Sequence, residues 1–303
     1  MTTSTQLTAL AAAMCVALSL AARQPPTFHA DTRLVVLHVT VTNGHGERVT
    51  NLDRGSFVVF EDGRSQPITF FRNDDVPTSL GLVIDNSGSM RSVRLRVEAA
   101  ALAFVRASNP LDEVFVLNFA DTPRIDVPFT NDVRVLEAGV ARVDAIGGTA
   151  MRDALLVAGR YLREHATHDR RALLVITDGN DNASTVSISE CRRAVERSGA
   201  AIYAVRLVRD TSWADPRGND DELDRLAELT GGIADRIAAT SNIEHVAQEM
   251  AHRIRTEYTI AYHPANQELD GSYRAIRVKV TKPGGLTVRT RPGYWATAPP
   301  KVP

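Results

Sequence analysis

Residues 79–90 read SLGLVIDNSGSM, an apolar run that stops abruptly at an acidic residue and two serines. Apolar and polar positions do not alternate between Leu80 and Ile84, as they would in a strand with one wet face. A short continuous apolar run is typical of a strand buried on both faces, which is the kind found in parallel sheets. The stretch therefore predicts a strand of a parallel sheet that ends in a polar loop.

Three oxygen-bearing side chains occupy alternate positions after this strand: Asp85, Ser87 and Ser89. Gly88 allows the backbone to curl where the strand ends. Hard oxygen ligands at the carboxyl end of a buried strand suit a small divalent cation. Serines at a helix start could instead cap the helix that follows, which is the ordinary structural interpretation of Ser87 and Ser89.

Two later segments supply the other oxygens that such a site needs. Thr149 follows a Gly-Gly pair before a helical pattern, and Asp178 closes a second apolar strand, residues 172–176. The pattern D-x-S-x-S, with this threonine and this aspartate in later loops, resembles the metal-ion-dependent adhesion site of von Willebrand factor type A domains. The resemblance implies that the hydroxyls ligate Mg²⁺ directly, with Mn²⁺ or Ca²⁺ as alternatives, and that the aspartates bind directly or through water. It also implies an open position for an Asp or Glu carboxylate of a protein partner.

Between residues 78 and 256 the sequence alternates strand-like and helix-like patterns. Such alternation predicts an α/β fold, a doubly wound and mostly parallel sheet with helices on both faces. Residues 122–127 are expected to form an edge strand. Capping boxes at Ser187 and Glu190 and at Ser241 and Glu244 predict two of the helix starts.

Both ends of the chain read as β structure. Strands are predicted at residues 34–41, 57–60, 68–71, 258–262, 276–280 and from residue 286, and Asp62-Gly63 is a favoured hairpin turn. Because neither end can bury two sheet faces alone, we expect the ends to form one small sandwich-like all-β domain into which the central domain is inserted. This arrangement resembles the bacterial VWFA-related Acidobacterial domain family, on the cues FVVFEDG at 57–63 and RPGY at 291–294. The expected parts are a signal peptide at 1–22, the β domain at 23–77 and 257–298, the type A domain at 78–256 and a tail at 299–303.

The run from Leu7 to Ala22 is apolar and carries no charged side chain. It is short for a membrane span and ends in small residues, which favours a cleaved export signal and a secreted or periplasmic protein with no membrane span after cleavage. An uncleaved membrane anchor is the alternative, because residues 1–6 contain no Lys or Arg. Cys15 lacks the preceding small residue of a lipoprotein site. Without it Cys191 stands alone, and its helical spacing predicts a buried apolar position.

Several function classes are excluded by the sequence. A formal net charge of -1 gives no electrostatic footprint for nucleic acid. No H-E-x-x-H, Walker or G-x-S-x-G pattern occurs. The loop at 178–189 lacks the glycine and glutamate of an EF-hand, so Asp181 and Asn182 are interpreted as a solvated loop at the rim of the main site.

The leading hypothesis from the sequence is an exported, non-enzymatic, metal-dependent binding module that takes part in adhesion or assembly. A structural component of an envelope complex, in which the metal only orders the loops, is the first alternative. A metal-dependent hydrolase is the second.

Overall fold

The computed structural model describes residues 34–141, 146–179, 181–208, 221–238 and 241–297. The predicted export signal and the tail at 299–303 lie outside these ranges. None of the helices in the described ranges is long and apolar enough to span a membrane.

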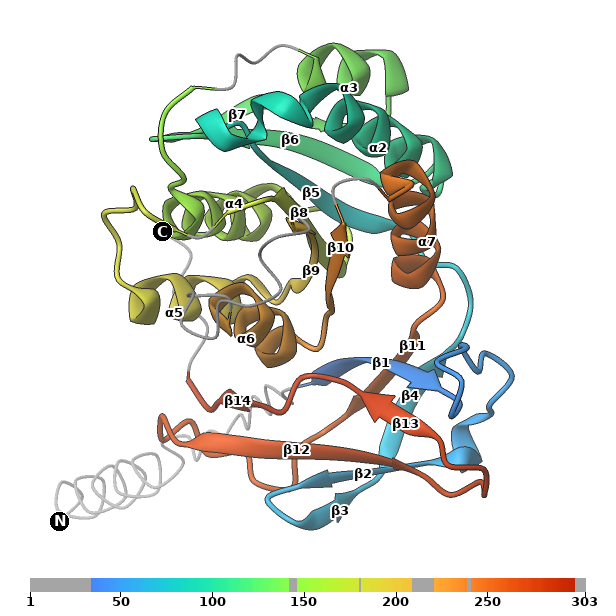
Figure 1. Ribbon diagram of the computed structural model, residues 1–303. Helices are drawn as coiled ribbons and strands as arrows, with labels where there is room; N and C mark the ends of the chain where they lie inside the picture. The colour runs from blue at the N-terminus through green and yellow to red at the C-terminus, as the bar shows by residue number, and fades with distance from the viewer. Residues whose placement is uncertain (1–33, 142–145, 180, 209–220, 239–240, 298–303) are drawn as a thin grey trace, which may run out of the picture. The chain divides into compact units, whose positions relative to one another are not determined.

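The central sheet has six strands in the order β10-β9-β8-β5-β6-β7 (Figure 1). They are β5 (Thr78–Asp85), β6 (Glu113–Phe119), β7 (Pro123–Thr130), β8 (Arg170–Thr177), β9 (Ala201–Val208) and β10 (Ala234–Ala238). All neighbouring strands are parallel except β7, which pairs antiparallel with β6 at the edge. The mostly parallel α/β fold predicted from the sequence is therefore confirmed.

Helices cover both faces of this sheet (Figure 1). They are α2 (Arg94–Ala107), α3 (Val133–Val140), α4 (Met151–His165), α5 (Ile188–Ser198), α6 (Asp221–Thr230) and α7 (Ile243–Arg255). Leu82 and Ile84 of β5 pack in one apolar cluster with α2, α3 and α7. Val83 packs in a second cluster with α4, α5 and α6. Successive side chains of a strand point to opposite faces, so β5 contributes to both cores and is buried along its whole length.

Two four-stranded sheets combine strands from both ends of the described chain. Their orders are β13-β1-β11-β4 and β14-β12-β2-β3. The strands are β1 (Val35–Thr42), β2 (Phe57–Glu61), β3 (Arg64–Gln66), β4 (Ile68–Arg72), β11 (Tyr258–Tyr262), β12 (Tyr273–Val280), β13 (Thr287–Arg289) and β14 (Gly293–Trp295). β1 pairs with β11 and β2 pairs with β12, as the sequence predicts for the two ends.

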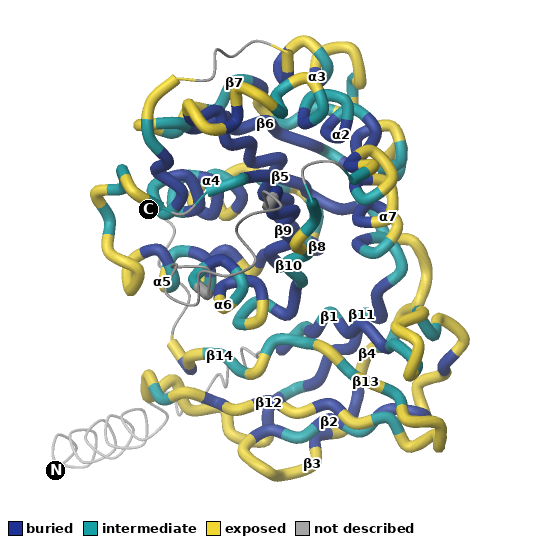
Figure 2. Tube along the Cα trace, viewed as in Figure 1, coloured by how far each residue is buried: buried dark blue, intermediate teal, exposed yellow. Residues whose placement is uncertain are grey.

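The two sheets share one apolar core. Val39, Val59, Ile260 and Val278 are buried in it, and the rings of Phe57 and Tyr258 lie 4.9 Å apart. Buried and exposed residues alternate along β12, as the colours of Figure 2 follow, so one face of this strand packs on the core and the other faces solvent. A shared core with short strands explains why neither end could form this structure alone.

The structure adds a short strand after the Asp62-Gly63 turn that the sequence pattern does not predict. The Asp62-Gly63 turn is present, with positive φ at both residues (48° and 79°) as a type I′ hairpin turn requires. The strand that returns from it is the short β3, whereas the strand at residues 68–72 belongs to the other sheet and pairs with β11. Pro67 separates them, and because proline has no N–H it cannot continue the ladder.

The two predicted capping boxes have different outcomes. The box of Ser187 and Glu190 is present at the start of α5. At α7 the N-cap is Asn242, whose side chain accepts a hydrogen bond from the His245 N–H, so the expected Ser241 box is wrong. Cys191 of α5 is fully buried, as expected, and burial raises the pKa of its thiol to about 12.

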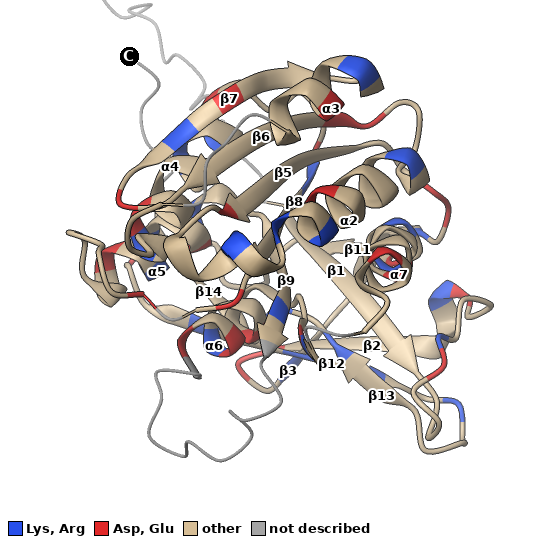
Figure 3. Cartoon of the chain, turned by 45° about the horizontal axis from the view of Figure 1, so that its top comes forward, with Lys and Arg blue, Asp and Glu red and all other residues tan. Residues whose placement is uncertain are grey.

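A buried polar cluster joins the base of the central sheet to the β sheets. Arg170 at the start of β8 forms an ion pair with Glu257, 2.9 Å long, and each side chain is only 4% exposed. Glu257 also accepts hydrogen bonds from Thr40 of β1 and from the Tyr203 hydroxyl. Elsewhere, charged residues of both signs are interspersed over the helices and strands (Figure 3).

Candidate metal centre

Asp85 is the last residue of β5, in the middle of the sheet, and is 1% exposed. Its carboxylate accepts a hydrogen bond from the Ser87 N–H (2.8 Å) and one from the Thr177 hydroxyl (2.5 Å). Among the described residues no cationic side chain forms an ion pair with it. Burial raises the pKa of Asp85 to about 6, against the hydrogen bonds, and the nearby negative charge of Asp178 adds to the rise. A buried carboxylate held only by neutral donors is the arrangement expected where a cation is to be bound.

The side chains of Ser87 and Ser89 lie between the Asp85 carboxylate and Asp178. The Ser87 and Ser89 hydroxyl oxygens lie 3.1 Å apart, and the Ser89 hydroxyl donates to Asp178 Oδ1 over 2.7 Å. Ser87 stands at the N-cap of the 3-10 turn Gly88–Ser92, but its hydroxyl makes no capping hydrogen bond. The capping interpretation of these serines is therefore wrong for Ser87, whose hydroxyl faces the other predicted site residues instead.

Thr149 reaches the same edge of the sheet from a second loop. The Gly88 N–H donates to the carbonyl of Gly147, and the Ile146 N–H donates to that of Asn86, so the two loops are joined by backbone hydrogen bonds. Gly147 has φ of 93°, and a Cβ there would lie 2.3 Å from the Asp121 carboxylate, so only glycine fits. Thr149 is 3% exposed.

The third loop completes the arrangement. Asp178 and Gly179 follow β8, and the Thr149 hydroxyl oxygen lies 3.6 Å from where a Cβ on Gly179 would stand. Asp178 is partly exposed, and Ser89 is exposed. All five predicted residues therefore lie at the carboxyl ends of β5 and β8 or in the loop before α4, where α/β sheets bind their ligands.

The donor set fits a hard divalent cation. Two ligands at right angles around Mg²⁺, each 2.0–2.1 Å from the metal, are about 2.9 Å apart. The oxygen separations of 3.1 Å and 2.7 Å along Ser87, Ser89 and Asp178 match this edge length. Within the described ranges, no group of three or more His, Cys, Asp or Glu side chains could hold a metal ion. The candidate centre, with two carboxylates and three hydroxyls, differs from such a cluster in being rich in neutral oxygens.

Comparison with known families decides the identity of this domain. Residues 80–180 match the family model described as the von Willebrand factor type A domain. The chain contains a von Willebrand factor type A domain. Domains of this family are commonly protein-interaction or adhesion modules.

The relatives of the type A domain are distant. The chain is 24% identical over 210 residues to human inter-alpha-trypsin inhibitor heavy chain H4, covering 63% of this chain and 22% of that protein. It is 29% identical over 163 residues to human calcium-activated chloride channel regulator 1, covering 50% of this chain and 16% of that protein. The chain thus spans about a fifth of the length of the curated relatives it matches. A solved von Willebrand factor type A structure from Catenulispora acidiphila shares the fold at 15% identity and a TM-score of 0.51, over 88% of this chain and 75% of that one.

Two residues support the candidate centre of the type A domain although sequence reasoning missed them. Thr177 is fully buried, and its hydroxyl both donates to Asp85 and accepts from the Gly179 N–H (3.1 Å). Asp121, in the turn after β6, accepts a hydrogen bond from the Gly148 N–H (2.7 Å). The only sequence signal for Thr177 is its place directly before Asp178 at a strand end.

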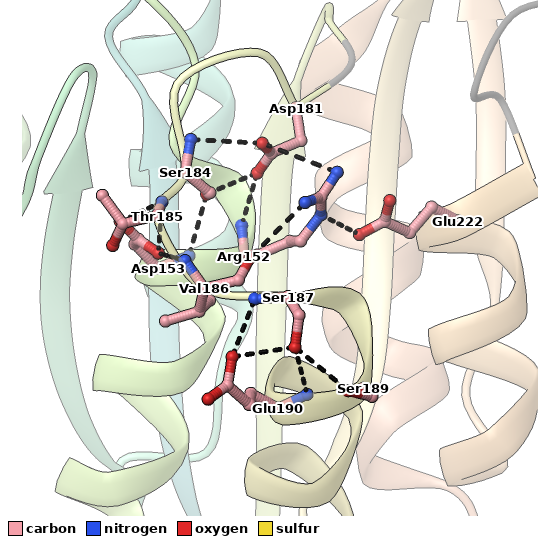
Figure 4. A network of polar contacts seen from close by, with 10 residues as sticks. All are labelled: Arg152, Asp153, Asp181, Ser184, Thr185, Val186, Ser187, Ser189, Glu190 and Glu222. Atoms are coloured by element: carbon pink, nitrogen blue, oxygen red, sulfur yellow. Dashed lines mark hydrogen bonds and ion pairs between the residues drawn. The ribbon is translucent and has the colours of Figure 1, made fainter.

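The interpretation of Asp181 and Asn182 as a solvated loop fits Asn182, which is exposed, but is wrong for the side chain of Asp181. The Asp181 side chain is 3% exposed and accepts hydrogen bonds from the Ser184 hydroxyl and from the Arg152 N–H (Figure 4). The Asn182 side-chain oxygen accepts from the Thr149 N–H (2.8 Å), and the backbone N–H of Asn182 donates to the Thr149 carbonyl. Asn182 therefore ties the loop that carries Asp178 to the loop that carries Thr149.

The first turn of α4 holds the rest of this loop. Asp153 accepts hydrogen bonds from the backbone N–H groups of Thr185 and Val186, and Arg152 forms an ion pair with Glu222 of α6, 2.9 Å long (Figure 4). The loop after β8 is thus fixed by side chains from two helices, which holds Asp178 in place before any ligand binds.

Proposed function

We propose that the type A domain binds a divalent cation, Mg²⁺ with Mn²⁺ or Ca²⁺ as alternatives, through Asp85, Ser87, Ser89, Thr149 and Asp178. Through that cation the domain takes an Asp or Glu carboxylate of a protein partner. The protein acts as an adhesion or assembly module in the cell envelope or outside the cell.

The observation that carries this proposal is the line of oxygens from Ser87 through Ser89 to Asp178, at separations of 3.1 Å and 2.7 Å. Ser89 and Asp178 are 89 positions apart in the sequence, and Asn182 and Gly147 hold the loops together. Oxygens at separations that metal ligands also adopt, beside a buried carboxylate with which no described cationic side chain forms an ion pair, support a metal site together with the motif.

Charge supports the open coordination position. Asp85 and Asp178, if both ionised, only balance a divalent cation, and the three hydroxyls add no charge. A bound cation would supply an electrophilic position for an incoming carboxylate oxygen. Ser89 is exposed and Asp178 is partly exposed, so a partner can reach this side of the site. The envelope location is supported by the apolar run at residues 7–22.

Titration of the apo protein with Mn²⁺ tests the metal site. Ser89→Ala removes one exposed hydroxyl, so the domain should keep its fold and lose at least about tenfold in Mn²⁺ affinity, a loss typical even of outer-shell substitutions. Ser189→Ala, at an exposed serine in the first turn of α5, is the matched control and should bind like the wild type. Equal affinity in both variants, measured by calorimetry, would contradict the metal assignment.

A second measurement separates partner binding from a purely structural metal. The relaxation of water protons reports water on bound Mn²⁺, and acetate or an Asp-containing peptide should displace that water and lower the relaxation enhancement. If the metal only orders the loops, Mn²⁺ should raise the melting temperature while acetate and the peptide leave the relaxation unchanged. That second result would overturn the carboxylate-binding part of the proposal.

A further inference from the structure

We propose that Asp121 recognises a basic side chain of the partner, an Arg or Lys that stands beside the acidic residue bound to the cation. This inference rests on the proposed function, because it concerns the neighbours of the metal-bound carboxylate. Asp121 is exposed and lies two positions beyond Phe119, the last residue of β6. Phe119 is paired with Asp85, the last residue of β5. Neighbouring strands are about 4.8 Å apart, so Asp121 lies at the same edge of the sheet as the candidate metal centre.

Two hydrogen bonds hold Asp121 against the loop that carries Thr149. The Ala150 N–H donates to the Ala120 carbonyl over 2.7 Å. The Gly148 N–H donates to Asp121 Oδ1, also over 2.7 Å. A Cβ on Gly148 would stand 3.1 Å from the same oxygen, so the carboxylate lies close against this loop. Its position is therefore fixed before a partner binds, which lowers the entropy that an ion pair with the partner would cost.

The negative charge of Asp121 is not balanced within the described part of the chain. Its hydrogen bond comes from a neutral backbone group, and no cationic side chain of the described residues forms an ion pair with it. Arg91, which follows the two serines of the candidate centre, already has an interaction partner of its own. Asp85 and Asp178 only balance a divalent cation, so Asp121 adds a negative charge that the cation does not offset.

This charge determines which acidic partners fit. A carboxylate that approaches the cation is repelled by Asp121, and a neighbouring Arg or Lys converts that repulsion into attraction. Charge complementarity of this kind contributes mainly to specificity and to the rate of association. Asp121 is one to two strand spacings, roughly 5–10 Å, from Asp85. Adjacent Cα atoms are about 3.8 Å apart, so the long side chain of a neighbouring residue reaches Asp121 while the carboxylate is on the metal.

A second metal ion fits Asp121 less well than a basic side chain. Ca²⁺ takes about six to eight oxygen ligands. Among the residues that the structure describes, no group of three or more His, Cys, Asp or Glu side chains could hold a metal ion. A guanidinium or ammonium group needs only one carboxylate for a charge-assisted hydrogen bond. The observations therefore favour a basic residue of the partner.

Water-proton relaxation on bound Mn²⁺ measures the preference for basic neighbours. The two probes are acetyl-Gly-Arg-Asp-Arg-Gly-amide and the neutral acetyl-Gly-Gln-Asp-Gln-Gly-amide, each titrated until it displaces the water on Mn²⁺. The full-length wild type should bind the basic peptide about threefold more tightly at low salt, which is the size expected for an exposed ion pair. In about 0.5 M NaCl this preference should shrink, because salt screens exposed charges.

Two variants locate the preference. Asp121→Asn keeps an oxygen for the Gly148 N–H and removes the charge, so the ratio of the two affinities should fall to about one. The ratio is taken within each variant, so any change in Mn²⁺ affinity cancels. Asp169→Asn is the matched control, because it removes the charge of an exposed aspartate directly before β8, roughly 30 Å from Asp178 at the other end of that strand. It should keep the threefold preference.

The outcomes separate this inference from the proposed function. Equal affinity of the wild type for the two peptides, or a preference that salt does not change, would overturn the role of Asp121 and leave the metal-bound carboxylate in place. The same holds for a preference that Asp121→Asn retains or that Asp169→Asn also loses. If neither peptide displaces water from Mn²⁺, the proposed function itself fails, and this inference fails with it.

Discussion

Thr177 shows how a single buried hydroxyl can position a candidate ligand without being one. It donates to Asp85 and accepts from the Gly179 N–H, so it joins the end of β5 to the loop that carries Asp178. Threonine ends many buried strands for reasons of β propensity alone, so its sequence position does not distinguish this role.

Thr177→Val should keep the shape of the side chain and remove both hydrogen bonds. Because the buried Asp85 carboxylate then loses a donor, we expect the apo protein to lose about 1–3 kcal/mol of unfolding free energy. Urea denaturation measures this loss. Thr69→Val, at an exposed threonine of β4 that donates to the Ala261 carbonyl, is the matched control and should cost clearly less. Equal costs would show that the Thr177 hydroxyl does not support Asp85.

His38 predicts a pH dependence of stability. Its folded pKa of about 4 lies below the ordinary value of 6.5, so the unfolded chain binds the proton more tightly. The contribution of neutral His38 to the unfolding free energy is therefore fully present above pH 6.5. It is lost as the pH falls from 6.5 toward 4, and the total loss is about 3 kcal/mol.

The difference in unfolding free energy between wild type and His38→Gln isolates this effect from other titrations. It should shrink by about 2 kcal/mol between pH 7.5 and pH 5, because glutamine does not titrate. His245→Gln, at an exposed histidine of α7, should follow the wild type at both pH values. A wild-type minus His38→Gln difference that does not change with pH would contradict the prediction.

At the scale of the elements, the loops after β5 and β8 and before α4 form one connected unit. Asn182 couples the last two loops: its side-chain oxygen accepts from the Thr149 N–H, and its backbone N–H donates to the Thr149 carbonyl. Asp153 and Arg152 fix the same loop to α4 and α6.

Asn182→Ala should lower Mn²⁺ affinity about 10- to 100-fold, as substitutions of residues that orient ligands typically do, while the melting temperature of the apo protein changes little. The altered affinity reflects a displaced Thr149 and not a lost ligand. Asn266→Ala, in the loop before β12, is the control, since its side chain accepts a local hydrogen bond from the Glu268 N–H, two positions along the chain. Calorimetric titration of both variants with Mn²⁺ tests this prediction. An unchanged Mn²⁺ affinity for Asn182→Ala would exclude a role of Asn182 in positioning Thr149.

The strands and the candidate ligands could be predicted because each depends on residues close together in the sequence. The buried run at Leu80–Ile84 and the alternation of Asp85, Ser87 and Ser89 are local patterns. The role of Asn182 depends on how two loops fold against each other, which periodicity does not report. The place of residues 68–72 in the second sheet follows from Pro67 and from pairing with β11, a partner far along the chain.

At the scale of the whole molecule, Glu257 is the central acceptor of the buried cluster that joins the two groups of sheets. It binds Arg170 of β8, Tyr203 of β9 and Thr40 of β1. A buried charge with three partners from different strands fixes the geometry of this junction more than it raises stability, because its desolvation offsets much of the attraction.

Glu257→Gln should leave Arg170 buried without its counterion and cost about 3–5 kcal/mol in unfolding free energy. Glu98→Gln breaks a partly exposed pair with Arg94 on α2 and should cost less than about 1 kcal/mol. Urea denaturation compares the two variants, and similar costs would argue against the role of Glu257 at the junction.

The mixing of strands from both ends also determines when each part can fold. Thr40 and Glu257 are 217 positions apart, yet they meet through one hydrogen bond, and β1 lies between β11 and β13. During synthesis the first four strands leave the ribosome long before their partners exist, whereas the type A domain between them has its six strands and helices in one continuous segment. The central domain can therefore complete its core first, while β1 to β4 remain with unsatisfied edges until the last strands emerge. The slow step of folding is then the closure of the β sheets around an already folded insert.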